Sequence, residues 1–186
     1  MILKGKIVTL RPIESEDLSF LQQLTNDPEL EHLIVGWSLP VSMKDQQQWF
    51  QNFRNTDKFI RYIIETEIDG VVGLTGLRDI DWKNGSAKGG GIRLLKKEIR
   101  SKGVATDAYM TMLRYAFEEL RLHRVGTGAL DYNSASLRFM EKCGFKREGV
   151  VRDAVFKNGA YHDEVILGCL KSDYEKIIEE TDYWNK

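Results

Sequence analysis

Cysteine and long apolar runs are both scarce in this sequence, and each shortage removes a class of protein. Only Cys143 and Cys169 occur among the 186 residues, which fits a reducing cytoplasm. No segment approaches the roughly 18 apolar residues that a membrane span needs, and residues 1–12 lack the apolar centre of a signal peptide. We therefore expect a cytoplasmic protein with no membrane partner.

A strong charge of either sign is also missing. The formal net charge is −1, whereas nucleic-acid-binding proteins usually carry a basic surface. No repeat, low-complexity tract or linker rich in Pro, Gly and Ser divides the chain. With 42% hydrophobic and 30% charged residues, the composition suits one domain over residues 1–186, with no nucleic-acid partner.

Motifs of several enzyme classes are absent as well. The chain has no Walker motif, G-x-G-x-x-G, G-x-S-x-G, H-E-x-x-H or C-x-x-C, so nucleotide-triphosphatase, dinucleotide-binding, hydrolase and metal-site interpretations have no motif to support them. His123 and His162 are therefore interpreted as structural residues, and Cys143 as a small buried side chain. We expect no metal.

The periodicity of apolar residues predicts the order of the elements. Ser15 is expected to cap the first helix, and Ser42 with Asp45 has the spacing of a capping box. The predicted helices are 15–24, 42–53, 103–120 and 133–144, with a short helix or turn at 26–33. The predicted strands are 6–13, 59–68, 71–80, 87–95, 123–132, 149–156 and 161–170.

Tight-turn dipeptides predict how the strands connect. The pairs at 69–70, 84–85 and 158–159 are Asp-Gly or Asn-Gly, which supply the positive φ angles of hairpins, so the strands that flank them should be antiparallel. The strand, helix and strand order across residues 87–132 implies a parallel crossover. The fold class is therefore mixed α/β (α+β), with a mainly antiparallel sheet flanked by helices.

The segment at residues 100–117 begins with a basic turn and becomes a long amphipathic helix. The first N–H groups of a helix have no partner inside it, and the helix dipole adds partial positive charge there, so phosphate can cap this end. Gly103 and Ala105 keep the turn slim enough for an anion to approach the backbone. The alternative is a surface helix with solvated charges. The basic residues around the turn are Arg93, Lys96, Lys97, Arg100 and Lys102, against one acid, Glu98.

Together with motifs elsewhere, this segment resembles the GNAT superfamily of acetyl-CoA-dependent N-acetyltransferases, in its RimJ/RimL-like branch. The resemblance covers nearly the whole chain, through "LKGKIVTLRPIESEDL", "FEELRLHRV", "NSASLRFMEKCGFKREG", "FKNGAYHDEVILG" and "SDYEK". It implies a sheet of about seven strands whose fourth and fifth strands splay apart to admit the pantetheine arm of acetyl-CoA. The oligomeric state, monomer or homodimer, stays open.

The resemblance also implies which residues hold acetyl-CoA. Backbone groups of residues 93–95 would face the pantetheine arm, residues 100–106 would cradle the pyrophosphate, and Asn133 would hydrogen-bond the arm. The helix would then be capped by cofactor phosphate. The residues concerned are Arg93, Leu94, Leu95, Arg100, Ser101, Lys102, Gly103, Val104, Ala105, Thr106 and Asn133.

The acid and base that relatives use are not at their usual positions. Met140 stands where many relatives have a tyrosine that protonates the thiolate, and residues 87–95 contain no glutamate. Met140 is interpreted as core packing. Ser136, at the N-x-x-S position, is the first candidate to contact the sulfur or a proton-relaying water, although a bond to backbone alone is the alternative. Tyr132 and Asp131 are further candidates for acid and base.

An acidic segment marks the region that the family places beside the acceptor cleft. No Lys or Arg occurs between Arg11 and Lys44, and a field of carboxylates would concentrate cationic amines there. The alternatives are a solvated acidic face and a core role for the tryptophan. The candidate acceptor residues are Glu14, Glu29, Glu31 and Trp37.

We therefore expect an enzyme that transfers the acetyl group of acetyl-CoA directly to a primary amine in a ternary complex. The acceptor is a protein N-terminus, a polyamine or another small amine. Deprotonation at pH 7 costs about 4.6 kcal/mol for a lysine-like amine and about 1.4 kcal/mol for an α-amine, so an N-terminal amine demands less of a base. The rival interpretation is a catalytically silent acyl-CoA-binding regulatory module.

Overall fold

A central β-sheet organises the computed structural model, which describes residues 1–95, 97–99 and 102–185. Within these residues the sheet has nine strands, of which β1 and β6 are only two residues long. The strands are β1 (Leu3–Lys4), β2 (Val8–Arg11), β3 (Phe59–Thr66), β4 (Gly70–Asp81), β5 (Ser86–Gly89), β6 (Arg93–Leu94), β7 (Arg124–Leu130), β8 (Lys146–Lys157) and β9 (Ala160–Leu170).

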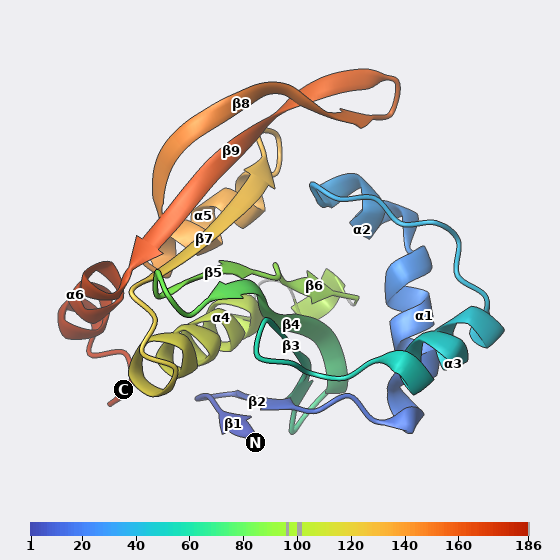
Figure 1. Cartoon of the computed structure of the whole chain (residues 1–186), viewed down its shortest axis with the longest axis horizontal. Coiled ribbons are helices and arrows are strands. Elements are labelled where there is room, and N and C mark those ends of the chain that lie inside the picture. The colour runs from blue at the N-terminus through green and yellow to red at the C-terminus, as the bar shows by residue number, and fades with distance from the viewer. Residues whose placement is uncertain (96, 100–101, 186) are drawn as a thin grey trace.

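Helices pack on this sheet and also lie at both of its ends. Helices α1 to α3 gather at one end of the molecule and α6 lies at the other (Figure 1). Helix α4 continues through Tyr115–Glu119 as a π-helix. The helices are α1 (Leu18–Asn26), α2 (Pro28–Leu33), α3 (Met43–Asn52), α4 (Val104–Arg114), α5 (Ser134–Lys142) and α6 (Lys171–Thr181), with 3₁₀ turns at Ser15–Asp17 and Lys97–Ile99.

The sheet has the order β1-β2-β3-β4-β5-β7-β9-β8, and β6 pairs with β4 beside that path. Pairing is antiparallel except between β5 and β7, which α4 joins as a parallel crossover. The hairpins at 69–70, 84–85 and 158–159 are confirmed. So is the capping box of Ser42 and Asp45 at α3. The mixed α/β fold class and its mainly antiparallel sheet are therefore confirmed.

Alternation along β3 divides the core between the two faces of the sheet. Ile63 is buried with Leu21 and Leu30 against α1 and α2, whereas Tyr62 and Ile64 belong to the larger cluster under α4. Successive side chains of a strand point to opposite faces, so one strand contributes to both clusters. The sheet therefore separates the layer of α1–α3 from the layer of α4.

The sheet opens between β5 and β7. These strands are paired only over residues 86–88 and 124–126. Beyond that point β6 pairs with β4, and the described partners of residues 127–130 all lie on β9. We call this divergence the fork, with residues 89–95 on one side and residues 127–130 on the other. It confirms the predicted splay of the sheet.

The prediction of one strand over residues 87–95 is wrong. The Gly90 N–H donates to Gly76 O at 2.8 Å, and Gly91 has a φ of 71°. A positive φ takes the chain out of a regular ladder, and glycine adopts it without a steric cost. The segment is therefore divided into β5 and β6, and this break begins one side of the fork.

The start of the first helix also differs from the prediction. Ser15 is not the cap, because Glu14 is the N-cap of the 3₁₀ turn Ser15–Asp17 and forms a capping box with Asp17. The Arg11 guanidinium donates to both carboxylate oxygens of Asp17 at 2.8 Å. This bidentate pair draws the turn towards β2 and leaves Ser15 exposed.

Candidate active site

Helix α4 begins at Val104 without a side-chain cap. Its N-cap, Gly103, has a φ of 80°, and a Cβ built on Gly103 would meet nothing within 4 Å. Among the described residues, therefore, nothing packs closely on Gly103, which leaves room at this end for an anion to approach. Arg100 and Ser101, which the sequence also assigns to this site, lie outside the described residues.

The other residues of this loop differ in exposure. Lys102 is exposed, and its Nζ lies 4.0 Å from a carboxylate oxygen of Asp69. Val104 is buried, so only its backbone is available, whereas Ala105 and Thr106 are half-buried. The described part of this loop thus offers backbone donors and the basic side chain of Lys102.

Residues 93–95 form one side of the fork. The Leu95 N–H donates to Val72 O at 3.2 Å, and Leu94 is buried, so β6 is held firmly on β4. Burial lowers the pKa of the Arg93 guanidinium, and the charge of Glu31 works against that shift. The Arg93 side chain therefore lies within electrostatic reach of Glu31 on α2.

Asn133 is the N-cap of α5, and its amide joins two helices. Its Oδ1 accepts the Ser136 N–H at 3.1 Å, and its Nδ2 donates to Leu33 O at the end of α2 at 2.9 Å. One amide hydrogen of Asn133 stays available for a ligand. The Ser136 hydroxyl has no hydrogen-bond partner within the described part of the chain, so it is also available.

Tyr132 lies between two imidazoles. Its ring stacks on His32 of α2, with ring centroids 4.9 Å apart, and meets the edge of His162 of β9 at 4.7 Å. The Tyr132 hydroxyl donates to His32 O at 2.5 Å. Burial, with the charge of Asp131, raises the pKa of Tyr132. Its proton is therefore held by a backbone carbonyl.

Little in the sequence indicates that His32 lies beside Tyr132. His32 lies in a short helix, 100 residues before Tyr132. Its Nδ1 is 3.1 Å from Asn158 Nδ2 in the β8–β9 turn. Asp131 is exposed, and one of its carboxylate oxygens accepts the N–H of Tyr132. His123 is exposed at the start of β7, at the other end of the strand from Tyr132.

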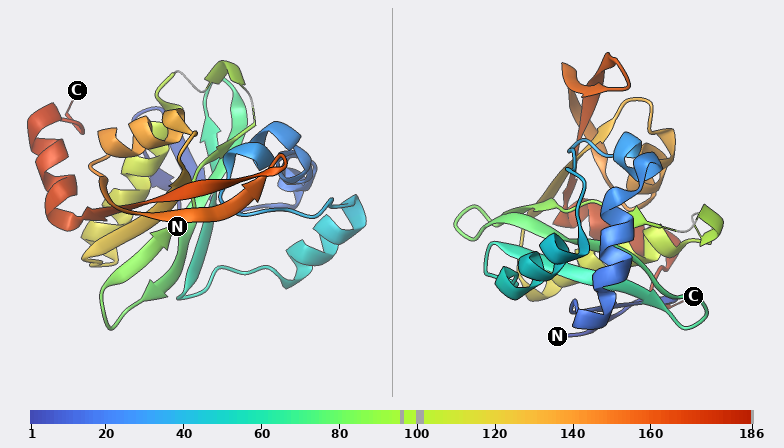
Figure 2. Two further views of the ribbon diagram at one scale, coloured as in Figure 1. Left: turned by 90° about the horizontal axis from the view of Figure 1, so that it is seen from above. Right: turned by 90° about the vertical axis from the view of Figure 1, so that its right-hand side faces the viewer.

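A buried lysine ties the β8–β9 hairpin to α2. The hairpin reaches across the molecule to this helix (Figure 2). Lys157 is 8% exposed, and its Nζ donates to Glu31 Oε1 at 2.5 Å, to Glu31 O at 2.9 Å and to Gly36 O at 2.7 Å. The second carboxylate oxygen of Glu31 is buried and has no hydrogen-bond partner in the described residues. Sequence reasoning missed Lys157, because a lysine beside an Asn-Gly turn usually faces solvent.

The other acceptor candidates are not gathered with Glu31. Glu14 lies at the opposite end of α1 from α2, whereas Glu29 is exposed within α2. Trp37 is 74% exposed, so the alternative of a core role is wrong. It lines a shallow hollow of about 350 Å³ with Leu39 and Val41.

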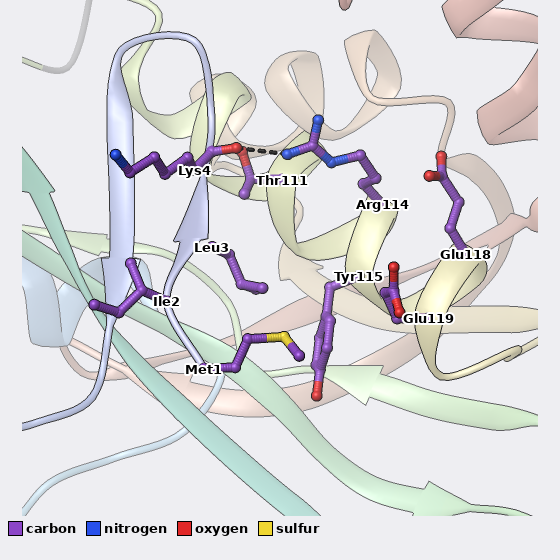
Figure 3. Close-up of a pocket in the computed structure, with 9 residues that line it drawn as sticks. All are labelled: Met1, Ile2, Leu3, Lys4, Thr111, Arg114, Tyr115, Glu118 and Glu119. Carbon is purple, nitrogen blue, oxygen red and sulfur yellow. Dashed lines mark hydrogen bonds between the residues drawn. The ribbon is translucent and has the colours of Figure 1, made fainter.

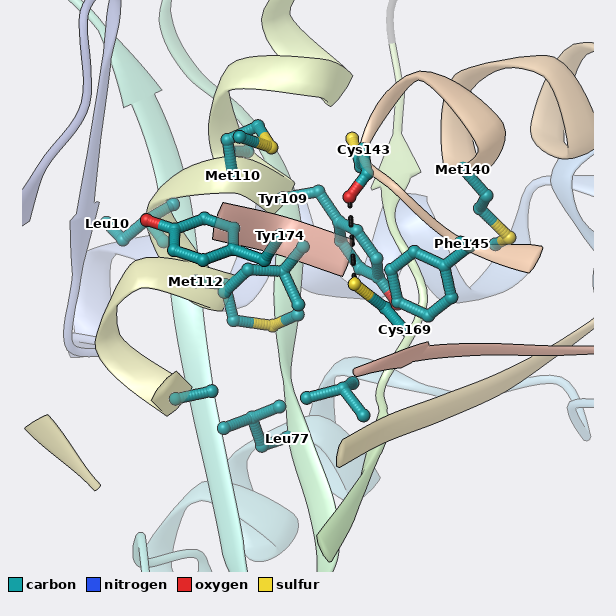
Figure 4. Close-up of a cluster of buried hydrophobic side chains, with 14 of the residues drawn as sticks. Leu10, Leu77, Tyr109, Met110, Met112, Met140, Cys143, Phe145, Cys169 and Tyr174 are labelled. Carbon is teal, nitrogen blue, oxygen red and sulfur yellow. Dashed lines mark hydrogen bonds between the residues drawn. The ribbon is translucent and has the colours of Figure 1, made fainter. Parts of the chain in front are cut away.

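Two apolar interpretations are confirmed. Met140 is 3% exposed and Cys143 is fully buried, and both pack in the larger core cluster (Figure 4). Burial raises the pKa of both thiols, Cys143 and Cys169, so neither is a ready nucleophile. Met140 carries no dissociable proton, so the position at which the family resemblance implies an acid holds a core side chain instead.

A second hollow lies elsewhere. It has a volume of about 340 Å³ and lies between the N-terminal strand and the far end of α4, where Arg114 donates to Lys4 O (Figure 3). Helices rise about 1.5 Å per residue, so this end is about 16 Å from Gly103. None of the candidate residues lines it.

Neither a metal cluster nor a membrane span is found in the described part. Among its His, Cys, Asp and Glu side chains, no group of three or more is placed to hold a metal ion. Among its helices, none is both long and apolar enough to cross a membrane.

The fork, the open N-terminus of α4 and the polar cluster of α2, β7 and β9 make up the candidate active site. Residues 8–146 match the family model described as "Acetyltransferase (GNAT) domain", so the chain belongs to the GNAT acetyltransferases. These enzymes use acetyl-CoA, and the chain is an acetyl-CoA-dependent N-acetyltransferase. The rival interpretation as a catalytically silent module finds no support in this grouping.

Individual relatives agree on the activity and differ in the acceptor. The uncharacterized N-acetyltransferase YokL, derived from the SPbeta prophage of Bacillus subtilis, is 31% identical over 92% of this chain and 94% of its own length. The spermidine N(1)-acetyltransferase of Vibrio cholerae is 28% identical over 90% and 95%. The putative ribosomal N-acetyltransferase YdaF of Bacillus subtilis is 38% identical, but over only 55% of each chain.

A solved structure gives the same result for the fold. The spermidine N-acetyltransferase from Vibrio cholerae, in complex with CoA and spermine, superposes with a TM-score of 0.82 at 26% identity. The superposition covers 92% of this chain and 99% of that one. The GNAT-like fold is therefore confirmed.

Proposed function

We propose that the protein acetylates a primary amine of a small cationic acceptor, a polyamine, and that it belongs to the RimJ/RimL-like branch. The observation that carries the proposal is the half-satisfied carboxylate of Glu31. Lys157 holds one oxygen in place, while the other is buried with no donor. A buried acceptor without a partner is costly, and an ammonium N–H would satisfy it.

The sequence predicted attraction of the acceptor by a field of carboxylates, and the ion pairs of the structure weaken that field. Lys157 and Arg93 offset the charge of Glu31, and Asp17 is paired with Arg11. Glu31 would therefore recognise an ammonium by a short-range hydrogen bond. Long-range attraction would come from the exposed carboxylates of α2 and of the turn before α1, and it would be weak in salt.

The described residues fit acetyl-CoA. The open N-terminus of α4, at Gly103 to Thr106, would hold the pyrophosphate through backbone N–H groups, with Lys102 beside it. The backbone of residues 93–95 would face the pantetheine arm, and Asn133 would donate its remaining amide hydrogen to it. When bound, acetyl-CoA supplies an activated acetyl thioester.

The protein must also take a proton from the attacking amine. We assign this task to the imidazoles that flank Tyr132, His162 and His32, because a neutral imidazole nitrogen is a common general base. For His162 this role replaces the structural one that the sequence suggested. Asp131 and Tyr132 are weaker candidates, since one is exposed and the other already donates to a carbonyl. Ser136 stays the candidate to position a proton-relaying water.

A comparison of amines tests the acceptor class. We expect kcat/KM for spermidine to exceed that for a monoamine of similar length by at least tenfold, about 1.4 kcal/mol. Glu31→Gln should remove most of that advantage through KM, whereas Glu179→Gln, an exposed carboxylate of α6 at the other end of the molecule, should not. Equal values for both amines would contradict the acceptor class and leave the N-acetyltransferase activity in place.

Peptides with free N-termini give the second arm. The kcat/KM for a basic peptide should exceed that for a matched acidic peptide. The ratio of the two values should fall as salt rises from about 50 to about 500 mM, because screening shortens the reach of the field. Preference for the acidic peptide would contradict the proposal. Tight acetyl-CoA binding with no turnover of any amine would restore the silent-module interpretation.

A further inference from the structure

Tyr109 is the fully buried tyrosine nearest to the fork. It lies on α4, and its ring is fully buried against Phe139, at a centroid distance of 5.6 Å, and Phe145, at 5.4 Å. Figure 4 shows this ring beside Phe145 and Cys169, on the side of the core that also holds Met140. Apolar and aromatic side chains therefore fix the ring and leave its hydroxyl as the one polar atom.

The Tyr109 hydroxyl has no hydrogen-bond partner in the described residues. Burial raises the pKa of Tyr109, so the phenol stays neutral and keeps its proton. Thr127 of β7 acts on that pKa in the opposite direction, but its hydroxyl does not meet the geometry of a hydrogen bond. Buried hydroxyls nearly always find a partner, so this exception needs an explanation.

The position of the hydroxyl supplies one. A Cβ built on Gly89 would lie 2.1 Å from the Tyr109 oxygen, so the hydroxyl fills the space that a side chain at this position would take. Gly89 is the last residue of β5 and follows Lys88, the last residue paired with β7. The hydroxyl therefore lies against the end of β5, where the strands part. By the helical rise, the Cα of Tyr109 is about 9 Å further along α4 than that of Gly103.

We propose that the Tyr109 hydroxyl donates a hydrogen bond to the sulfur of acetyl-CoA and stabilises the departing thiolate, in place of the residue that Met140 does not provide. The hydroxyl keeps its own proton. As the amine nitrogen bonds to the acetyl carbon, the carbon–sulfur bond breaks with its electron pair on sulfur. Tyr109 stabilises that charge until the proton lost by nitrogen reaches sulfur through solvent.

This proposal does not depend on the acceptor, because the thioester is the same for every amine. In the proposed complex the unpaired hydroxyl of Tyr109 has a hydrogen-bond acceptor, the sulfur of acetyl-CoA. It also explains why position 89 is glycine, since any larger residue would displace the hydroxyl. Donors preorganised at a site of developing charge are effective because they need no reorganisation during the reaction.

Tyr109→Phe tests the proposal, since phenylalanine keeps the packing and removes only the oxygen. We expect kcat to fall by about 10- to 100-fold with the amine KM unchanged. We expect the melting temperature of the free protein to stay level or rise, because an unpaired buried hydroxyl is lost. Unchanged kcat, or a fall in stability without a fall in kcat, would show that the hydroxyl serves the fold and would overturn the proposal.

Tyr174→Phe is the matched control. Tyr174 of α6 is also buried, but its hydroxyl donates to Glu118 at 3.1 Å and accepts from Trp184 at 3.2 Å. This variant should lose stability and keep kcat. An equal loss of kcat in both variants would overturn the specific role of Tyr109.

Binding gives a readout that needs no turnover. CoA should bind the wild-type protein more tightly than desulfo-CoA, by several-fold at about pH 9, where a free thiol ionises, and by less at about pH 7. Calorimetry measures both affinities. Tyr109→Phe should lose the preference, while equal affinities in the wild-type protein at both pH values would overturn the proposal.

Discussion

Asp107 and Tyr109 are two residues apart on α4, and both are buried, but they face regions of opposite character. The carboxylate of Asp107 accepts the N–H groups of Lys6, Ile7 and Val8 between 2.8 and 3.1 Å, and the hydroxyl of Tyr183 at 3.0 Å. The hydroxyl of Tyr109 faces the fork and has no partner among the described residues. Both sides of the helix are buried, but one is closed by hydrogen bonds within the chain and the other holds a polar atom without a partner.

The same contrast recurs between two carboxylates of the N-terminal region. Both oxygens of Asp17 are bonded by Arg11, and one also accepts the Glu14 N–H. Glu31 has one oxygen bonded by Lys157 and the other buried without a donor. Asp17 is completely satisfied and holds the fold, whereas the incomplete satisfaction of Glu31 is the feature on which we propose its contact with the acceptor.

The largest effect is expected where the closed side of α4 is broken. Asp107→Ala removes the acceptor of three backbone N–H groups and should cost about 3 kcal/mol of unfolding free energy, because the Val8 N–H stays buried without a partner and the bonds of Lys6 and Ile7 are lost as well. Tyr183→Phe removes only the fourth donor and should cost about 1 kcal/mol. Urea denaturation measures both, and similar losses would contradict the view that Asp107 organises the N-terminal strands.

The second effect concerns Asp17 and depends on pH. Although burial alone would raise it, hydrogen bonds from Arg11 and the Glu14 N–H hold the pKa of Asp17 below its usual value. A carboxyl with a lower pKa in the folded state stabilises the fold above the unfolded pKa, about 3.9, and loses that contribution as pH falls through the folded pKa.

Asp17→Asn should therefore lose about 2 kcal/mol of unfolding free energy at pH 7. Its difference from the wild-type protein should shrink as pH falls below about 4, because the unfolded wild-type carboxyl is protonated first and the folded one follows as pH passes its lowered pKa. Denaturation at a series of pH values measures the difference. A gap that stays constant into acid would contradict the role given to the Arg11 pair.

The third effect tests the open end of α4. Gly103→Glu places a negative side chain where phosphate must approach and forces a positive φ on a residue other than glycine. We expect acetyl-CoA binding to weaken at least tenfold, about 1.4 kcal/mol. Gly103→Asn is the matched variant, because asparagine tolerates this backbone and adds no charge. Unchanged affinity of the folded Glu variant by calorimetry would rule out this loop as the phosphate site.

The smallest effect is expected at Met140. Met140→Leu keeps volume and polarity in the core, so it should change the unfolding free energy by less than about 1.5 kcal/mol and leave kcat unaltered. A large fall in kcat with unchanged stability would show that the thioether takes part in the reaction. Such a result would also weaken the case for Tyr109.

Local signals predicted much of this protein correctly. The three Asp-Gly or Asn-Gly hairpins, the capping box before α3 and the uncapped glycine start of α4 follow from a few neighbouring residues each. The failures are also local. The strand pattern over residues 87–95 does not show that the chain turns at Gly90 and Gly91. Ser15 has the sequence context of an N-cap, but the ion pair of Arg11 with Asp17 makes Glu14 the N-cap instead.

By itself, the sequence determined the order of the elements, the mixed α/β class and the family, because periodicity, turn dipeptides and motifs depend on residues close together in the chain. Only the tertiary structure decided which polar groups are satisfied. Lys157 meets Glu31 across 126 residues and Tyr132 meets His32 across 100. The hydroxyl of Tyr109 reaches the fork only because the last residue of β5 has no side chain, and no local pattern records such a contact, since it arises when strands and helices pack in three dimensions.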